Sequence, residues 1–193
     1  MDTKVILLGI GAFVLVLLLF GGVWTISSYN GIISQGQAVD AQWGNVQAAY
    51  QERNDLIPNI INTVRSTMKY ESGLLENITA LRTQWMNAKT TDDKIAAGSA
   101  MDSAISRLLV VQENYPQLKA MDSANTLMFT LEGQENRIRV ERMRYNDAVR
   151  GYNLAVKTFP GSLMANWMGV KEKPYFQAVA GADVAPHVGD LTQ

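Results

Sequence analysis

The chain has 193 residues, of which 47% are hydrophobic and 18% are charged, and its formal net charge at pH 7 is -1. This balance argues against a strongly basic surface and therefore against nucleic acid as a partner. The lack of cysteine excludes disulfides, thiolate metal sites and a cysteine nucleophile, and the single histidine argues against catalytic triads and most zinc or di-iron centres. We therefore expect a protein that is not an enzyme, with no catalytic, cofactor-binding or metal-binding residues.

The first predicted element is a membrane-spanning helix within residues 1–28. Residues 5–26 carry no charged side chain. A helix of this length is about 33 Å long, which is enough to cross the hydrocarbon core of a bilayer. A cleaved signal peptide is the alternative, but its apolar region is shorter, about 7–15 residues, and is followed by a small-x-small cleavage site. We therefore expect a retained anchor that crosses the cell membrane once.

The charges beside this anchor predict its orientation. Lys4 precedes the span, and the first basic residue after it is Arg53. Cytoplasmic flanks carry the excess of lysine and arginine, so the N-terminus is expected in the cytoplasm and the rest of the chain outside it.

Residues 29–159 are predicted to form four long helices. In the first, seam residues are spaced alternately by three and four, which is typical of a helix packed in a bundle. This seam consists of Ile32, Gly36, Val39, Trp43, Val46, Tyr50, Arg53 and Ile57. Pro58 is expected to mark a corner, with Asp55 and Asn59 supplying side-chain caps for the second helix.

The other three helices follow from the same spacing. The core residues of the second are Ile61, Val64, Met68, Leu75, Ile78 and Trp85. Residues 89–93 are expected to form a turn in which Thr91 or Asp92 caps the third helix. The core residues of the third, which is expected to stop at Pro116, are Met101, Ala104, Leu108, Val111 and Tyr115.

The fourth helix has the clearest repeat. Its aromatic and aliphatic residues recur every seven positions, at Ile138, Tyr145, Tyr152 and Phe159, until Pro160 and Gly161 end the helix. No stretch alternates with a period of two, so no strand is expected. The predicted fold is all-α, with an N-terminal transmembrane helix followed by an elongated antiparallel four-helix bundle.

Five polar residues interrupt these seams, at Arg53, Glu71, Arg82, Glu135 and Arg142. One interpretation is a buried polar layer that acts as a site. The other is a set of partly exposed pairs, or a buried network that fixes the register of the helices at a cost in stability. We favour the second interpretation, because no nucleophile or metal ligand accompanies these residues.

Residues 160–193 are expected to form an amphipathic segment and a flexible C-terminal tail. On a helix, Leu163, Met164, Trp167 and Met168 share one face, and two lysines follow. An apolar face with tryptophan, flanked by cations, is typical of a helix at a membrane interface. The fourth helix should return to the bilayer, near the level of Trp24. The alternative is that this face packs on the bundle or on a neighbouring subunit.

From Tyr29 to about Phe176 the sequence resembles the LemA family of membrane-anchored proteins. The resemblance depends on Trp43 and on ordered motifs at residues 53–64, 70–82, 107–120, 135–138 and 145–153, closed by Phe159 and Pro160. It implies a transmembrane helix and a long four-helix bundle. It carries over no catalytic residues, and the association of some relatives with bacterial internal membranes implies a scaffold by analogy.

Two functions are compatible with these features. The first is a membrane-anchored, non-enzymatic scaffold or assembly protein of the bacterial envelope that self-associates. The alternative is an adaptor or sensor that presents its bundle to another envelope protein, such as a transporter or a membrane protease. The expected partners are the lipid bilayer, further copies of the chain and, for the alternative, that envelope protein.

Overall fold

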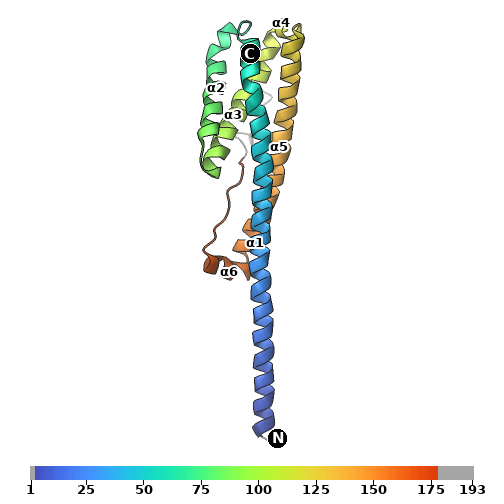
Figure 1. Ribbon diagram of the computed structural model, residues 1–193, viewed down its shortest axis with the longest axis vertical. Coiled ribbons are helices and arrows are strands. Elements are labelled where there is room, and N and C mark those ends of the chain that lie inside the picture. The colour runs from blue at the N-terminus through green and yellow to red at the C-terminus, as the bar shows by residue number, and fades with distance from the viewer. Residues whose placement is uncertain (1–2, 178–193) are drawn as a thin grey trace, which may run out of the picture. The chain divides into compact units, whose positions relative to one another are not determined.

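The structure is a computed structural model that describes residues 3–177, and every regular element in that range is helical (Figure 1). The long helices are α1 (Thr3–Val64), α2 (Ser72–Asn87), α3 (Thr91–Val111) and α5 (Asp122–Lys157). The short elements are η1 (Lys69–Glu71), η2 (Gln112–Asn114), α4 (Pro116–Lys119) and α6 (Gly161–Met168). The all-helical prediction is confirmed, as is the long apolar helix at the N-terminus.

The predicted corner at Pro58 is wrong, because Pro58 lies inside α1. Proline has no N–H to donate to the carbonyl four residues earlier, so the carbonyl of Asn54 loses its helical partner. The side chain of Arg82 replaces that donor, with its Nε 2.8 Å from the Asn54 oxygen. The helix therefore continues through Pro58 because α2 satisfies the carbonyl that the proline leaves free.

The chain reverses after Val64 instead. The amides of Thr67 and Met68 both donate to the Val64 carbonyl, at 3.0 and 2.8 Å. Ile61 and Val64, which were expected on the second helix, are thus buried residues of α1, and Met68 is buried in the turn. The predicted caps fail for the same reason. Asp55 lies within α1 and accepts a hydrogen bond from Gln51 Nε2 at 2.8 Å.

The predicted break between the second and third helices is present but shorter than expected: it covers residues 88–90, because residues 91–93 already belong to α3, and the cap lies before the predicted Thr91 or Asp92. Thr90 is the N-cap of α3, and its Oγ1 accepts from the amide of Asp93 at 3.1 Å. The same hydroxyl donates to Oδ2 of Asp93 at 2.7 Å, which fixes the cap further. α3 ends at Val111, before the expected stop, and Pro116 begins α4, where a missing N–H costs nothing.

The chain divides into two compact units. The first comprises residues up to Trp43 and Tyr145–Lys173. Within it α1 and α5 run antiparallel, because the ring of Trp43 lies 5.3 Å from that of Tyr145, and the ring of Trp24 lies 6.3 Å from that of Phe159. Tyr145 and Tyr152 are buried, as their seven-residue repeat predicts, but the prediction is wrong for Phe159, the last member of the repeat, which is exposed and lies beyond the end of α5 at Lys157.

The first unit also holds the extended segment that follows α6. The side-chain amide of Asn153 forms two hydrogen bonds with the backbone of Lys173, donating to its carbonyl at 2.9 Å and accepting from its N–H at 2.8 Å. The Lys173 ammonium forms an ion pair with Asp40 and lies 5.4 Å from the centre of the Tyr152 ring. These contacts hold the segment against α5 and α1.

The second unit comprises Gly44–Arg144 and the described part of the chain from Pro174. Here α2 and α3 pack against each other (Figure 1). The core is aliphatic and aromatic, and its largest fully buried apolar side chains include Tyr50, Ile60, Met68, Ile78, Met101, Ile105, Leu108, Leu131 and Ile138. Phe176 is also buried in this unit, although it was expected in a flexible tail. Residues 178–193, the rest of that predicted tail, lie outside the described residues.

Candidate functional site

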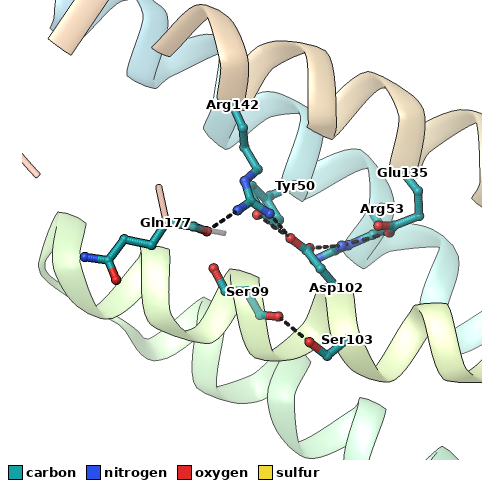
Figure 2. A network of polar contacts seen from close by, with 8 residues as sticks. All are labelled: Tyr50, Arg53, Ser99, Asp102, Ser103, Glu135, Arg142 and Gln177. Atoms are coloured by element: carbon teal, nitrogen blue, oxygen red, sulfur yellow. Dashed lines mark hydrogen bonds and ion pairs between the residues drawn. The ribbon is translucent and has the colours of Figure 1, made fainter. Parts of the chain in front are cut away.

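The most prominent polar feature is a group of five residues in the second unit, which we call the polar cluster. It consists of Tyr50 and Arg53 from α1, Asp102 from α3, and Glu135 and Arg142 from α5 (Figure 2). Nη1 of Arg53 lies 2.7 Å from Oδ1 of Asp102 and 2.8 Å from Oε1 of Glu135. One guanidinium therefore joins three helices.

Arg53 occupies the centre of the cluster because it lies on the core-facing seam of α1. Its side chain is 0% exposed, and its guanidinium carbon lies 4.7 Å from the centre of the Tyr50 ring, one helical turn earlier. Its Nε and Nη2 atoms are buried and have no hydrogen-bond acceptor among the described residues. The charge is thus stabilised by two carboxylates and one aromatic face rather than by a full set of hydrogen bonds.

Asp102 connects the second arginine to the first. Its Oδ2 forms an ion pair with Nη1 of Arg142 and accepts a hydrogen bond of 3.4 Å from the Tyr50 hydroxyl. Asp102, Glu135 and Arg142 are 14%, 19% and 18% exposed, so each of them reaches the surface of the cluster while Arg53 does not. Two guanidiniums face two carboxylates, and the formal charges of these four groups cancel.

The chain after α6 covers one side of the cluster. The Phe176 ring stacks on the Tyr50 ring with 6.4 Å between centroids, and the guanidinium carbon of Arg142 lies 4.6 Å from the centre of the Phe176 ring. Arg142 Nη2 also donates to the backbone carbonyl of Gln177 at 3.2 Å (Figure 2). Arg142 therefore binds both an acidic side chain and this C-terminal segment.

Tyr50 is also held by packing against α2 and α3. The Trp85 ring of α2 stacks on it at 5.6 Å, and the Lys94 ammonium lies 4.1 Å from the centre of the Trp85 ring. Gly98 of α3 makes room for the Tyr50 hydroxyl, because a Cβ at that position would lie 2.8 Å from the hydroxyl oxygen. Larger side chains at position 98 would displace the tyrosine ring.

Burial and charge set the protonation states of the cluster. Burial lowers the pKa of Arg53, but Glu135 and Asp102 outweigh this effect, and its pKa is raised above the ordinary value. Burial raises the pKa of Glu135 by more than the neighbouring Arg53 lowers it. Burial and the Asp102 carboxylate also raise the pKa of Tyr50 far above its ordinary value. Arg53 is therefore a permanent cation and Tyr50 a neutral donor.

The interactions observed at this site are ion pairs between guanidinium and carboxylate groups. A surface depression of about 330 Å³ adjoins the cluster, lined by charged and polar side chains that include Asp102, Glu132, Glu135, Arg139 and Arg142. Within residues 3–177 no group of three or more histidine, aspartate or glutamate side chains is placed to hold a metal ion. The arrangement fixes the rotational setting and register of α1, α3 and α5, because each helix contributes a charge that needs the others.

The structure brings together three of the five polar residues that interrupt the seams. Arg53, Glu135 and Arg142 meet in the cluster, and Arg82 lies nearby in the same unit, bound to the Asn54 carbonyl. Glu71 belongs to η1, and among residues 3–177 no contact places it with the other four.

Asp102 was missed because it lies beside the apolar stripe of α3 rather than on it. A signal was nevertheless present in the sequence. A buried arginine needs acidic partners, and the acidic residues of α3 are Asp92, Asp93 and Asp102, of which the first two lie in its first turn. Of these three, Asp102 is the one far enough along α3 to reach the protein interior between the helices.

Comparison with known proteins places these features in context. Residues 42–189 match the model of the LemA family. Two relatives are the magnetosome proteins MamQ 2 and MamQ 1 of Paramagnetospirillum magneticum, each 24% identical, and a third is the magnetosome protein MamQ of Magnetospirillum gryphiswaldense, 21% identical. Each comparison covers 80% of this chain and 66% of the relative, so the chain spans slightly less than two thirds of the relatives it matches.

Proposed function

Because the chain belongs to the LemA family, we propose that it is a membrane-anchored, non-enzymatic scaffold or assembly protein of the bacterial envelope that associates with further copies of itself. In this proposal the second unit is built on an elongated antiparallel bundle of α1, α2, α3 and α5. The single observation that carries the proposal is the composition of α1, a helix that contains both an apolar span and the central residue of the polar cluster.

The N-terminal part of α1 has the surface of a membrane anchor. All side chains from Leu7 to Phe20 are exposed, and this stretch is long and apolar enough to cross a bilayer. Exposed leucine, valine and phenylalanine side chains in such a continuous run are stable in hydrocarbon and costly in water. The same helix continues to Val64, and Arg53 lies on its buried side.

The polar cluster supports a structural role for the second unit. Its charges are directed at one another and hold three helices together. A buried network of this kind favours one register over others, which suits a protein that has to present a defined surface.

Self-association requires an exposed surface, and α5 carries one within the second unit. Phe129 is 77% exposed and Met143 is 61% exposed. Their separation is two heptads, so both residues lie on the same face of the helix. Aromatic and methionine side chains are enriched at protein interfaces, and we assign this face to contact with a second copy.

Light scattering of the detergent-extracted protein, and of the protein in nanodiscs, tests this proposal. The wild-type particle is expected to have a mass that is a multiple of the subunit, and the double variant Phe129→Ser/Met143→Ser is expected to lose mass. Tyr70→Ser is the matched control, because Tyr70 is 94% exposed on η1, away from this face of α5. A strict monomer in both media contradicts the scaffold, and a particle containing a different envelope protein supports the adaptor or sensor instead.

A further inference from the structure

The short helix α6 and the residue before it present a second exposed apolar surface, in the first unit. Phe159 is 78% exposed, Leu163 59% and Trp167 79%. Leu163 and Trp167 are four residues apart on α6 and therefore share a face. We call these three residues the aromatic patch.

The opposite side of α6 is packed against the protein. Met164 and Ala165 are buried, so the helix is held in place rather than projecting freely. At its start, a Cβ on Gly161 would lie 2.1 Å from the carbonyl oxygen of Ala155, so only glycine allows this close approach to α5. At its end, Gly169 has a φ of 68°, the left-handed conformation that terminates a helix. The predicted apolar face is thus divided between a packed half and an exposed half.

The position of the aromatic patch along α1 is fixed by a ring contact. The Phe159 ring lies 6.3 Å from the Trp24 ring. Trp24 lies near the end of the stretch 5–26, which carries no charge. Phe159 therefore lies beside the part of α1 where the apolar run gives way to polar residues, and Leu163 and Trp167 follow it by four and eight residues in the chain. Tryptophan is enriched at that level of membrane proteins.

The surrounding charges fit the same environment. α6 contains no charged residue, while Lys157 and Lys171 are exposed on either side of it in the sequence. Lys157 is paired with Glu172 at 3.0 Å. An apolar face with tryptophan and adjacent lysines is the composition of helices that lie in the headgroup region of bilayers.

We propose that the aromatic patch inserts into the interfacial region of the same bilayer leaflet in which α1 ends its span. Eight residues give marginal lipid affinity on their own, but the anchor keeps the patch at a high effective concentration at the membrane surface. This inference rests on the proposed membrane anchor. It gives the first unit two points of attachment to one bilayer, the span and the patch.

The test uses the full chain reconstituted in vesicles of phosphatidylcholine and phosphatidylglycerol, at about one copy per vesicle so that contacts between copies are rare. The chain contains no cysteine, so single cysteines can be introduced and labelled with bimane. The variants are Trp167→Cys and Leu163→Cys in the patch, Leu19→Cys in the span and Phe129→Cys on α5. Fluorescence is quenched from the lipid side by doxyl lipids and from the aqueous side by iodide.

The expected result is a loss of most fluorescence to doxyl lipid at positions 167 and 163, as at position 19, with little loss at position 129. Quenching of both patch positions by iodide alone, while position 19 is quenched by lipid, overturns the inference and leaves the anchor intact. Protection of both patch positions from both quenchers also overturns it, because the patch is then covered by protein. A span position that lipid does not quench overturns the anchor and this inference with it.

Discussion

At the scale of single residues, Arg53 shows how an ionised group is retained in a protein core. Its charge is compensated by Asp102 and Glu135, and Asp102 is shared with Arg142. Removing one partner of a buried ion pair costs about 3–5 kcal/mol, because the remaining charge stays buried without compensation. When all four groups are present, their net contribution to the free energy of unfolding is much smaller, because the cost of removing the charges from water nearly equals their mutual attraction. The cluster therefore selects one arrangement of helices more than it stabilises that arrangement.

The titration of Glu135 gives a prediction at this scale. Its pKa is raised above the ordinary value of 4.5 in the folded protein, mainly by burial. The stability contribution of a group with a raised pKa is fully present below its unfolded pKa and is lost as the pH rises through its folded pKa. Glu135→Gln removes this titration while keeping an acceptor for Arg53.

We therefore expect the free energy of unfolding of the wild type, relative to Glu135→Gln, to fall as the pH rises from the ordinary pKa of 4.5 through the higher pKa of Glu135 in the folded protein. Denaturant unfolding of the detergent-solubilised full chain at several pH values measures this difference. The neighbouring Asp102, Arg53 and Arg142 are present in both proteins, so the two proteins differ in one ionisable group of the cluster. A difference that rises with pH would show that pairing with Arg53 outweighs burial.

At the scale of secondary-structure elements, α1 and α2 are coupled by one hydrogen bond, which Arg82 of α2 donates to the backbone carbonyl of Asn54 in α1. Pro58 leaves the Asn54 oxygen without a helical donor, and Arg82 supplies one across the helix pair. A mid-helix proline normally costs about 3 kcal/mol, partly through this lost hydrogen bond. The arginine therefore offsets part of that cost from another element.

A double-mutant cycle tests this dependence. Arg82→Met is expected to destabilise the wild type by about 1.5–3 kcal/mol, as for other hydrogen bonds to charged groups. In Pro58→Ala the restored N–H satisfies the Asn54 carbonyl, so the same substitution should cost about 1 kcal/mol less. Denaturant unfolding monitored by circular dichroism measures all four proteins. Arg107→Met is the control, because Arg107 is exposed on α3 and its effect should be the same in both backgrounds. Strict additivity for Arg82 would refute the dependence.

The same elements show how far local sequence patterns lead. Seven-residue spacing identifies helices and most of their buried faces, as Tyr145 and Tyr152 illustrate. It does so because the apolar residues on one face of a helix recur with the helical period. Pro58 is misread because the rule for proline considers only neighbouring residues of the same helix, whereas the donor that compensates the Asn54 carbonyl is Arg82, 28 positions after Asn54. Asp102 is hidden for a similar reason, since its partners belong to α1 and α5. Periodicity within one helix does not predict which side chains of two different helices form a hydrogen bond or an ion pair.

At the scale of the whole molecule, membrane attachment is the feature most readily predicted from the sequence. The uncharged run at residues 5–26 predicts the exposed apolar stretch of α1, because a helix needs about 20 apolar residues to cross the hydrocarbon core of a bilayer. The self-association that we propose cannot be derived from the sequence in the same way. Contacts between copies depend on which exposed side chains find a complementary surface, and a single chain does not specify that.

Orientation in the membrane gives the prediction that belongs to this scale. Lys4 lies before the span and no lysine or arginine follows it until Arg53, so the second unit is expected outside the cytoplasm. A cysteine at Tyr70, which is 94% exposed in the second unit and lies outside the proposed contact face of α5, should react with a membrane-impermeant maleimide in intact cells, after permeabilisation of any outer membrane. The cysteine-free wild type controls for background labelling. Reaction only after cell lysis would reverse the assigned orientation.

The pairing of Asn153 with residue 173 has a consequence for how this sequence can vary. Both hydrogen bonds go to the peptide backbone of residue 173, one to its carbonyl and one from its N–H. The amide of Asn153 therefore recognises a position in the chain and not a type of side chain. Position 173 can change freely in this respect except to proline, which has no N–H. Position 153 cannot, because aspartate lacks the donor and a longer glutamine changes the geometry. In divergent relatives, a conserved asparagine beside a variable partner is the pattern that such a contact should leave.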